Sequence, residues 1–292
     1  MNLERNIPPP IRDPHPPTRF VPPPGACDAH CHVFGPAHRF PFAPDRTYTP
    51  PDSGFEELIA LHDGLGLGRA VLVQASCHGK DNSALIDALR RGEGRFAGVA
   101  MIDESIDDEQ LAEMHGVGVR GIRFNFVRHL RGPVGTTRVL ALAERVASLG
   151  WHVELHMDAE QIPRHRRLFD GLETPFIIDH MGRVKASAGP DQEPFRFLRE
   201  VLGREEKAWV KVSGAERLTG KGPPYDDVVP LARALIEAAP DRILWGTDWP
   251  HPNVPQMPDD GDLVDLLSDF APEEGIRNRI LVENPERLYD FD

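Results

Sequence analysis

Short apolar segments rich in Val, Ile and Phe alternate along the chain with longer segments whose apolar residues recur every three to four positions. The short segments are typical of buried parallel strands, and the longer ones of helices with one apolar face. Strands are expected at residues 26–33, 69–75, 96–102, 119–124, 152–156, 175–180, 208–212 and 242–247. Helices are expected at residues 56–65, 82–91, 109–115, 137–149, 194–202, 228–239, 263–270 and 276–282.

Eight alternations of strand and helix predict an α/β fold, a (β/α)8 barrel of the TIM type. A length of 292 residues suits one such barrel, so residues 25–292 are expected to form a single domain. Residues 1–24 hold nine prolines and predict an extended N-terminal arm. Active sites of these barrels lie at the carboxyl ends of the strands, so polar residues at those ends are the functional candidates.

Composition narrows the partners and the compartment. A net charge of −13 argues against nucleic acid or an anionic membrane surface as partner, because both require a basic face. No apolar run approaches the about 20 residues that span a bilayer, and the N-terminus lacks the apolar core of a signal peptide. Three cysteines without framework spacing are typical of a reducing compartment. We therefore expect a cytoplasmic protein. These features are also compatible with a homo-oligomer.

The first predicted strand ends in Asp28-Ala29-His30-Cys31-His32. Side chains alternate along a strand, so His30 and His32 are expected to point the same way. Two aligned imidazoles can bind one metal ion or one polarised carbonyl oxygen. The other interpretation is two hydrogen-bonded polar residues at a strand end.

Other polar residues follow later strands. His156 ends the fifth, Asp179 and His180 the sixth, and Asp248 the eighth. These ends meet at one mouth of a barrel, where imidazoles and a carboxylate match the ligands of a catalytic zinc site.

Five segments carry a family resemblance: 28–36, 73–79, 120–126, 178–183 and 245–253. They resemble the amidohydrolase superfamily, and within it the 2-pyrone-4,6-dicarboxylate lactonase group, which includes 4-sulfomuconolactone hydrolase. The resemblance implies hydrolysis of a small anionic lactone from the breakdown of aromatic compounds. Asp248 would act as the base that activates water, and His180 would stabilise or protonate the reacting lactone. The implied substrate contacts are Tyr48, Ser76, His78, Arg123, Arg217 and His251.

Two positions depart from that group. His156 stands where the pyrone dicarboxylate enzymes have tyrosine, and a substrate-binding arginine falls here at His129, beside Arg128. The first change completes a zinc set of His30, His32, His156 and Asp248 and favours an enzyme of the 4-sulfomuconolactone hydrolase type. The second weakens one anion contact unless Arg128 replaces it. A metal-independent lactonase is the alternative.

Each assignment has a competing interpretation. His156 could only donate a hydrogen bond, and Arg123 and Arg217 could pair with acidic neighbours such as Glu154 and Glu216. Ser76 and His78 could cap a loop. A decarboxylase or a sugar-lactone hydrolase or isomerase of the same superfamily competes for the function, as does a barrel that binds ligands without catalysis.

Overall fold

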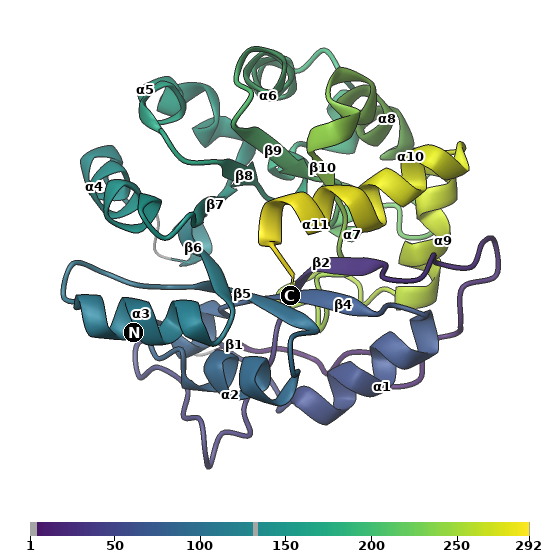
Figure 1. Cartoon of the computed structure of the whole chain (residues 1–292). Coiled ribbons are helices and arrows are strands. Elements are labelled where there is room, and N and C mark those ends of the chain that lie inside the picture. The colour runs from purple at the N-terminus through teal and green to yellow at the C-terminus, as the bar shows by residue number, and fades with distance from the viewer. Residues whose placement is uncertain (1–4, 131–133, 292) are drawn as a thin grey trace.

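The structure is a computed structural model that describes residues 5–130 and 134–291. Its centre is a parallel sheet of eight strands, seen along the barrel in Figure 1, in which each strand pairs with the next along the chain. The strands are β2 (Cys27–Cys31), β4 (Arg69–Val73), β5 (Phe96–Ala100), β6 (Val119–Phe126), β7 (His152–Met157), β8 (Phe176–Ile178), β9 (Ala208–Lys211) and β10 (Ile243–Leu244). All eight predicted strands are confirmed, and so is the barrel.

Helices surround this sheet (Figure 1). The longer ones are α1 (Phe55–Leu65), α2 (Ser83–Arg91), α3 (Asp108–Gly116), α4 (Thr136–Ala147), α6 (Glu193–Arg204), α8 (Val229–Ala238) and α9 (Asp260–Phe270). The shorter ones are α5 (Arg166–Gly171), α7 (Ala215–Leu218), α10 (Glu274–Asn278) and α11 (Asn284–Tyr289), with a π-helical turn over Arg279–Glu283. In the described part of the chain, no helix combines the length and the apolar character that crossing a membrane requires.

The barrel closes where β10 meets β2. The Ala29 amide donates to the Trp245 carbonyl at 2.8 Å, and the Asp248 amide donates to the His30 carbonyl at 2.7 Å. A Cβ atom at Gly246 would lie 2.4 Å from the His30 nitrogen. Only glycine therefore lets the two strands approach this closely, and the approach brings His30 next to Asp248.

The Asp28 carboxylate stabilises the same junction through hydrogen bonds to both segments. Its carboxylate accepts the backbone amides of His30 and Thr247, at 3.1 and 3.0 Å, and the Thr247 hydroxyl at 2.6 Å. His62 of α1 lies 3.2 Å from the same carboxylate. One buried side chain thus fixes both segments that lead into the candidate site.

The amino end of the barrel is filled by apolar side chains. Tyr289 of α11 packs there, fully buried, with a cluster that consists of Cys27, Ala29, Val71, Val73, Ala97, Val99, Ile177, Trp209 and Leu244. In Figure 1, α11 lies across this end of the barrel. The polar strand ends described below lie at the opposite end.

The described residues of the N-terminal arm, 5–24, run along the barrel and contain no helix. Thr18 and Arg19 donate their backbone amides to Asp265 of α9 at 2.9 and 2.8 Å. Further toward the N-terminus, β1 (Arg5–Asn6) pairs in parallel with β3 (Tyr48–Thr49). The arm therefore connects α9 to a strand at the mouth of the barrel.

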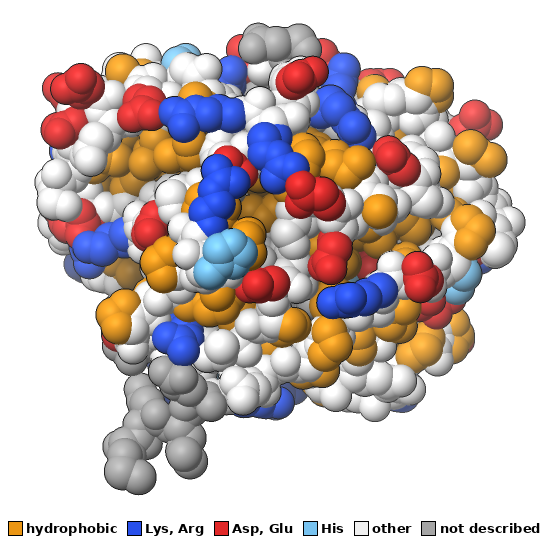
Figure 2. Space-filling model, turned by 90° about the horizontal axis from the view of Figure 1, so that it is seen from below, with side chains coloured by type: hydrophobic (Ala, Val, Ile, Leu, Met, Phe, Trp, Pro, Cys, Tyr) orange, Lys and Arg blue, Asp and Glu red, His pale blue; other side chains and the backbone are white. Residues whose placement is uncertain are grey.

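The molecular face in Figure 2 carries basic and acidic side chains interspersed among hydrophobic ones. On that face no large patch of a single charge is visible.

Candidate active site

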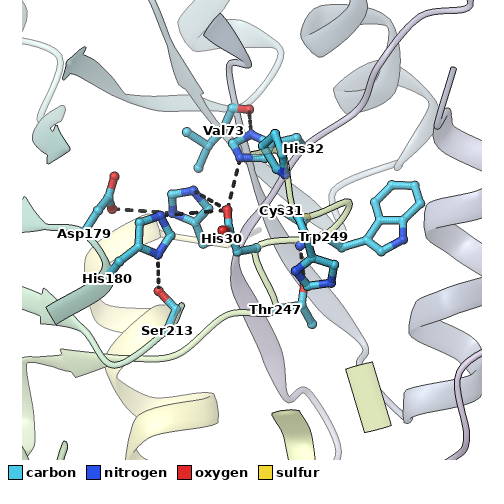
Figure 3. A network of polar contacts seen from close by, with 12 residues as sticks. His30, Cys31, His32, Val73, Asp179, His180, Ser213, Thr247 and Trp249 are labelled. Carbon is cyan, nitrogen blue, oxygen red and sulfur yellow. Dashed lines mark hydrogen bonds and ion pairs between the residues drawn. The ribbon is translucent and has the colours of Figure 1, made fainter. Parts of the chain in front are cut away.

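Three imidazoles surround one carboxylate at the mouth of the barrel. The Nε2 atoms of His32, His30 and His180 lie 3.4, 3.6 and 3.8 Å from Asp248 Oδ1. Figure 3 shows the three rings gathered together, His32 held by the Val73 carbonyl and His180 by Ser213. The expected common orientation of His30 and His32 is what the structure has.

Three of these four side chains, His30, His180 and Asp248, form a group that fits a divalent metal ion. His30, His180 and Asp248 offer ligand atoms within 4.8 Å of one another, and His30 Nε2 has no hydrogen-bond partner among the described residues. Metal bonds of about 2.0–2.1 Å in a tetrahedral site put neighbouring ligand atoms about 3.4 Å apart. His32 donates Nδ1–H to the Val73 carbonyl at 2.8 Å, which leaves the Nε2 lone pair facing Asp248.

Two of these imidazoles, those of His30 and His180, are uncharged at neutral pH. Burial lowers the pKa of His30 to about 3, with Lys211 adding to the effect, and burial also takes the pKa of His180 well below its usual value. Neutral imidazole is the form that binds metal or polarises a carbonyl. The arrangement therefore suits either role at neutral pH.

His156 lies beside this group and outside the metal-ligand cluster. Its Nδ1–H donates to Asn125 Oδ1 at 3.0 Å, and its Nε2 lies 3.5 Å from an Arg183 guanidinium nitrogen. A cation next to that nitrogen opposes the binding of a second cation there. The geometry therefore matches the hydrogen-bonding interpretation of His156, and His180 stands where the predicted set had His156.

Asp248 is tied to an arginine. Arg217 donates to Asp248 Oδ2 through two guanidinium nitrogens and to the Pro252 carbonyl at 2.9 Å. Burial alone would raise the pKa of the Asp248 carboxyl, but Arg217 and His180 hold it well below its usual range. Asp248 is therefore an ionised carboxylate whose second oxygen faces the imidazoles.

A buried network of charged side chains contacts His30 at its Nδ1 atom. Lys211 donates to Glu154 and lies 3.5 Å from Asp179, while Arg123 binds Asp179 at 3.1 Å. His30 Nδ1 lies 3.0 Å from Lys211 Nζ and 3.4 Å from Asp179 Oδ1. His30 Nδ1 can thus accept a hydrogen bond from the ammonium or donate one to the carboxylate, so each tautomer of His30 has a partner.

The two central arginines are both paired and both line the inner cavity. Arg123 contacts Glu154 at 3.4 Å in addition to Asp179, and Arg217 contacts Glu216 at 3.4 Å in addition to Asp248. The predicted pairing with acidic neighbours is therefore present, with a second carboxylate in each case.

Arg128 and His129 differ in placement. The Arg128 side chain is 85% exposed and lies 3.7 Å from Glu160. His129, by contrast, lines the inner cavity with Tyr48 and Ser76. The structure thus brings His129 to the site and leaves Arg128 at the surface.

Tyr48 and Ser76 reach the inner cavity, whereas His78 and His251 do not line it. His78 accepts the Gly35 amide at 3.3 Å and donates to the Pro41 carbonyl at 3.3 Å, as a loop-holding residue does. His251 is buried and lies 3.0 Å from Asp260.

Four residues in the segments that carry the site have an unfavourable backbone conformation. Left-handed φ values occur at His180 (50°), Asp248 (66°), His251 (57°) and Asn253 (64°). Each such residue costs on the order of 1–3 kcal/mol and persists where its surroundings fix it. Such strain is concentrated at functional sites, and here it falls on both catalytic candidates.

Sequence reasoning missed Lys211, Asn125, Ser213 and Arg183. A signal for the first three was present: polar residues alternate across the carboxyl ends of two predicted strands, as in Arg123-x-Asn125 and Lys211-x-Ser213. Strands of a parallel barrel are otherwise apolar, so this alternation marks the barrel interior near a site. Arg183 follows a left-handed turn, and its approach to His156 had no signal in the sequence.

Known proteins are similar to this chain in sequence and in fold. Residues 27–291 match the family described as amidohydrolase. A 2-pyrone-4,6-dicarboxylate hydrolase of Comamonas testosteroni is 46% identical over 280 residues, which cover 93% of this chain and 92% of that protein. A 4-sulfomuconolactone hydrolase of Hydrogenophaga intermedia is 46% identical over 277 residues, 94% of this chain and 91% of that protein. A solved structure described as a putative 2-pyrone-4,6-dicarboxylic acid hydrolase from Pseudomonas putida superposes with a TM-score of 0.81 at 32% identity, covering 92% and 98% of the two chains.

Proposed function

The chain belongs to the amidohydrolase family, and from that premise we propose that it hydrolyses a small anionic lactone of the 4-sulfomuconolactone type. The observation that carries the proposal is the Asp248 carboxylate at the barrel mouth. Arg217 holds one of its oxygens, and the other faces three imidazoles. A fixed base beside groups that polarise a carbonyl is what ester hydrolysis requires.

Asp248 is the proton acceptor in this proposal. A water between Asp248 Oδ1 and the lactone carbonyl gives its proton to the carboxylate as its oxygen attacks the carbonyl carbon. The C–O bond to the ring oxygen then breaks, and the proton on Asp248 passes to that oxygen as it leaves as an enol or alcohol. Arg217 keeps Asp248 ionised at the start of the cycle.

Zinc is the metal we propose, held by His30, His180 and Asp248 with His32 as the neighbouring ligand. When bound, it would polarise the carbonyl and lower the pKa of a coordinated water toward about 7. His156 is then a hydrogen-bonding residue, fixed by Asn125 and Arg183.

A metal-independent lactonase is the second candidate, and Lys211 favours it. When the ammonium donates to His30 Nδ1 at 3.0 Å, the ring proton stays on Nε2, where it donates a hydrogen bond to the lactone carbonyl. Zinc analysis of the purified protein separates the candidates. Activity that is lost with zinc on chelation supports the first, and full activity of metal-free protein supports the second.

Anion binding follows from the arginines that line the cavity. Arg123 and Arg217 line it beside Asp248, together with His129, whose pKa is lowered by burial and by the nearby arginines. Guanidinium groups bind carboxylate or sulfonate through two parallel hydrogen bonds and so orient the ring. They supply local positive potential in a chain whose net charge is −13.

The substitution Asp248→Asn tests the base. We expect ring opening to fall by on the order of 10³-fold, because the amide cannot accept the proton of water. Activity is followed by the ultraviolet absorbance of 4-sulfomuconolactone and of 2-pyrone-4,6-dicarboxylate, and circular dichroism verifies the fold. Asp259→Asn, at the N-terminus of α9, is the matched control. Undiminished turnover by Asp248→Asn would refute the mechanism.

A further inference from the structure

The first described residues of the N-terminal arm lie beside the mouth of the barrel. In the pairing of β1 with β3, Arg5 is opposite Tyr48 and Asn6 is opposite Thr49. The Ile7 amide continues this pairing and donates to the Thr49 carbonyl at 3.1 Å. The hydrolysis proposed above gives this segment of the arm no role.

Ile7 is buried, although its neighbours in the arm are not. Its side chain is in a residue that is 8% exposed, whereas residues 5, 6, 8 and 9 are exposed. It packs into an apolar cluster, the Ile7 cluster, that consists of Ile7, Phe34, Tyr48, Ala75 and Cys77, with Phe42 and Leu130 packed against it. The arm thus contributes one apolar side chain to the packing at the mouth.

The Ile7 cluster lies directly behind the wall of the inner cavity. Tyr48 and Leu130 contact the cluster and also line that cavity. Phe34 stacks on His32, with ring centroids 5.9 Å apart, and lies edge-on to Tyr48 at 6.5 Å. The His32 ring and the Tyr48 ring are therefore supported by the same apolar group.

The same cluster supports Ser76. Ser76 lines the inner cavity, and both of its neighbours in the chain, Ala75 and Cys77, belong to the Ile7 cluster. Asn125 Nδ2 donates to Ser76 Oγ at 3.2 Å, and Asn125 Oδ1 accepts from His156. A shift of the cluster would therefore move a side chain that is hydrogen-bonded to the rest of the site.

Arg5 shows that the arm lies close to the cavity on a second side. Side chains two residues apart in a strand share a face, so Arg5 and Ile7 point the same way. Burial lowers the pKa of His129, and Arg183, Arg217 and Arg5 add to this effect. Arg5 is therefore near His129, which lines the inner cavity.

The space beside Asp248 is narrow, so the position of its wall matters. The inner cavity has a volume of about 20 Å³ and adjoins a cavity of about 360 Å³, and Ser76, Arg123 and Leu130 line both. A lactone that brings its carbonyl to Asp248 must hold the rest of its ring at this junction. Displacements of about 1 Å at such a contact can cost on the order of 10²-fold in rate.

We propose that Ile7 is a positioning residue, which holds Tyr48, Ser76 and Leu130 in place as the wall against which the lactone ring binds. Ile7 does not itself line the inner cavity and acts through its cluster. Truncation of a buried side chain leaves a space into which its neighbours relax, so Ile7→Ala should loosen this wall. The inference rests on the proposed function, because it assumes that a lactone binds there.

The first test measures whether Ile7 covers its cluster. Cys77 is fully buried, so its rate of alkylation by N-ethylmaleimide reports how often the cluster opens, and mass spectrometry locates the label. We expect Cys77 to react about tenfold faster in Ile7→Ala than in the unmodified protein. Cys27 and Cys31 are buried in other clusters and should keep their rates. An unchanged rate at Cys77 would overturn the proposal.

The second test measures the effect on the substrate. Kinetics use 2-pyrone-4,6-dicarboxylate and 4-sulfomuconolactone. Because Ile7 supports the binding wall and not the base, we expect KM to rise about fivefold in Ile7→Ala while kcat stays within about twofold. Ile7→Val retains most of the side chain and should restore KM. A KM that does not change in Ile7→Ala refutes the positioning role, even where Cys77 reacts faster.

Phe20→Ala is the matched control. Phe20 is also an apolar residue of the arm, but it packs against the main core, and the Arg277 guanidinium lies 5.1 Å from its ring. Cys77 alkylation and KM should be the same in this variant as in the unmodified protein. Equal changes in the Ile7 and Phe20 variants would indicate a general loosening of the arm and would overturn the specific role of Ile7.

The positioning role and the proposed hydrolysis fail separately. A protein that opens neither lactone refutes the proposed function, and the alkylation of Cys77 then decides whether Ile7 supports the wall. A protein that opens a lactone with the same KM in Ile7→Ala retains the function and refutes the positioning role.

Discussion

Two charge networks in this protein differ in burial. Inside the barrel, the buried cations Lys211 and Arg123 pair with the buried carboxylates Glu154 and Asp179 next to His30. Where the arm meets α9, His15 and Arg19 pair with aspartates at partly exposed positions. Buried charges lose much hydration and must be paired, whereas exposed pairs gain little and are screened by salt. The first network therefore positions the site, and the second fastens the arm.

The largest expected effect comes from Lys211→Met. It leaves Glu154 and Asp179 buried with less compensation, and we expect the free energy of unfolding to fall by about 3–5 kcal/mol. Urea denaturation measures the loss. Adding Glu154→Gln should recover part of it, since the double variant removes both partners of a pair. A loss under about 1 kcal/mol would contradict the contrast with the exposed network.

A smaller effect is expected from Asp265→Asn in the arm network. This carboxylate accepts both backbone amides of Thr18 and Arg19 and the Thr18 hydroxyl. An amide can replace only part of these charge-assisted bonds, so we expect a loss of about 1–2 kcal/mol. Thermal unfolding measures it, and limited proteolysis should show earlier cleavage within residues 5–24. Arg12→Gln, whose exposed pair with Glu57 spans 3.6 Å, serves as the control.

The smallest effect is the pH dependence of His15. The Pro16 carbonyl and the Asp262 carboxylate raise the pKa of His15 to about 9. Protonated His15 thus stabilises the folded arm. This contribution is fully present below about pH 6.5, the pKa of the unfolded chain, and is lost as the pH rises through 9. The difference in melting temperature between the unmodified protein and His15→Gln should shrink over that interval. A difference that is constant from pH 6 to 10 would contradict the assignment.

Much of the fold could be predicted because its signals are local. Each barrel strand falls in a short segment rich in apolar residues, and longer helices have an apolar face toward the barrel, as α6 does with Phe195, Leu198 and Val201. The helices α5, α7 and α11 were missed because six, four and six residues are too few for a periodic pattern. The pairing of β1 with β3 depends on a contact across more than 40 residues.

The sequence located some residues of the site correctly but did not reveal the role or placement of others. His30, His32, His180 and Asp248 could be found because strand ends of a barrel converge. The metal assignment of His156 came from counting ligands, and the sequence does not reveal that Arg183 approaches its second nitrogen. Arg128 and His129 are adjacent in sequence, yet only a three-dimensional path distinguishes the exposed side chain from the one in the cavity.

The first and last described segments of the chain lie at opposite ends of the barrel. Arg5 and Asn6 pair with the strand that presents Tyr48 to the inner cavity, while Tyr289 closes the amino end through α11. A purification tag or fusion partner on the N-terminus would therefore be tethered beside the entrance for substrate. Attachment through the C-terminus would leave that entrance facing away from the support, which makes it the better choice for an immobilised catalyst.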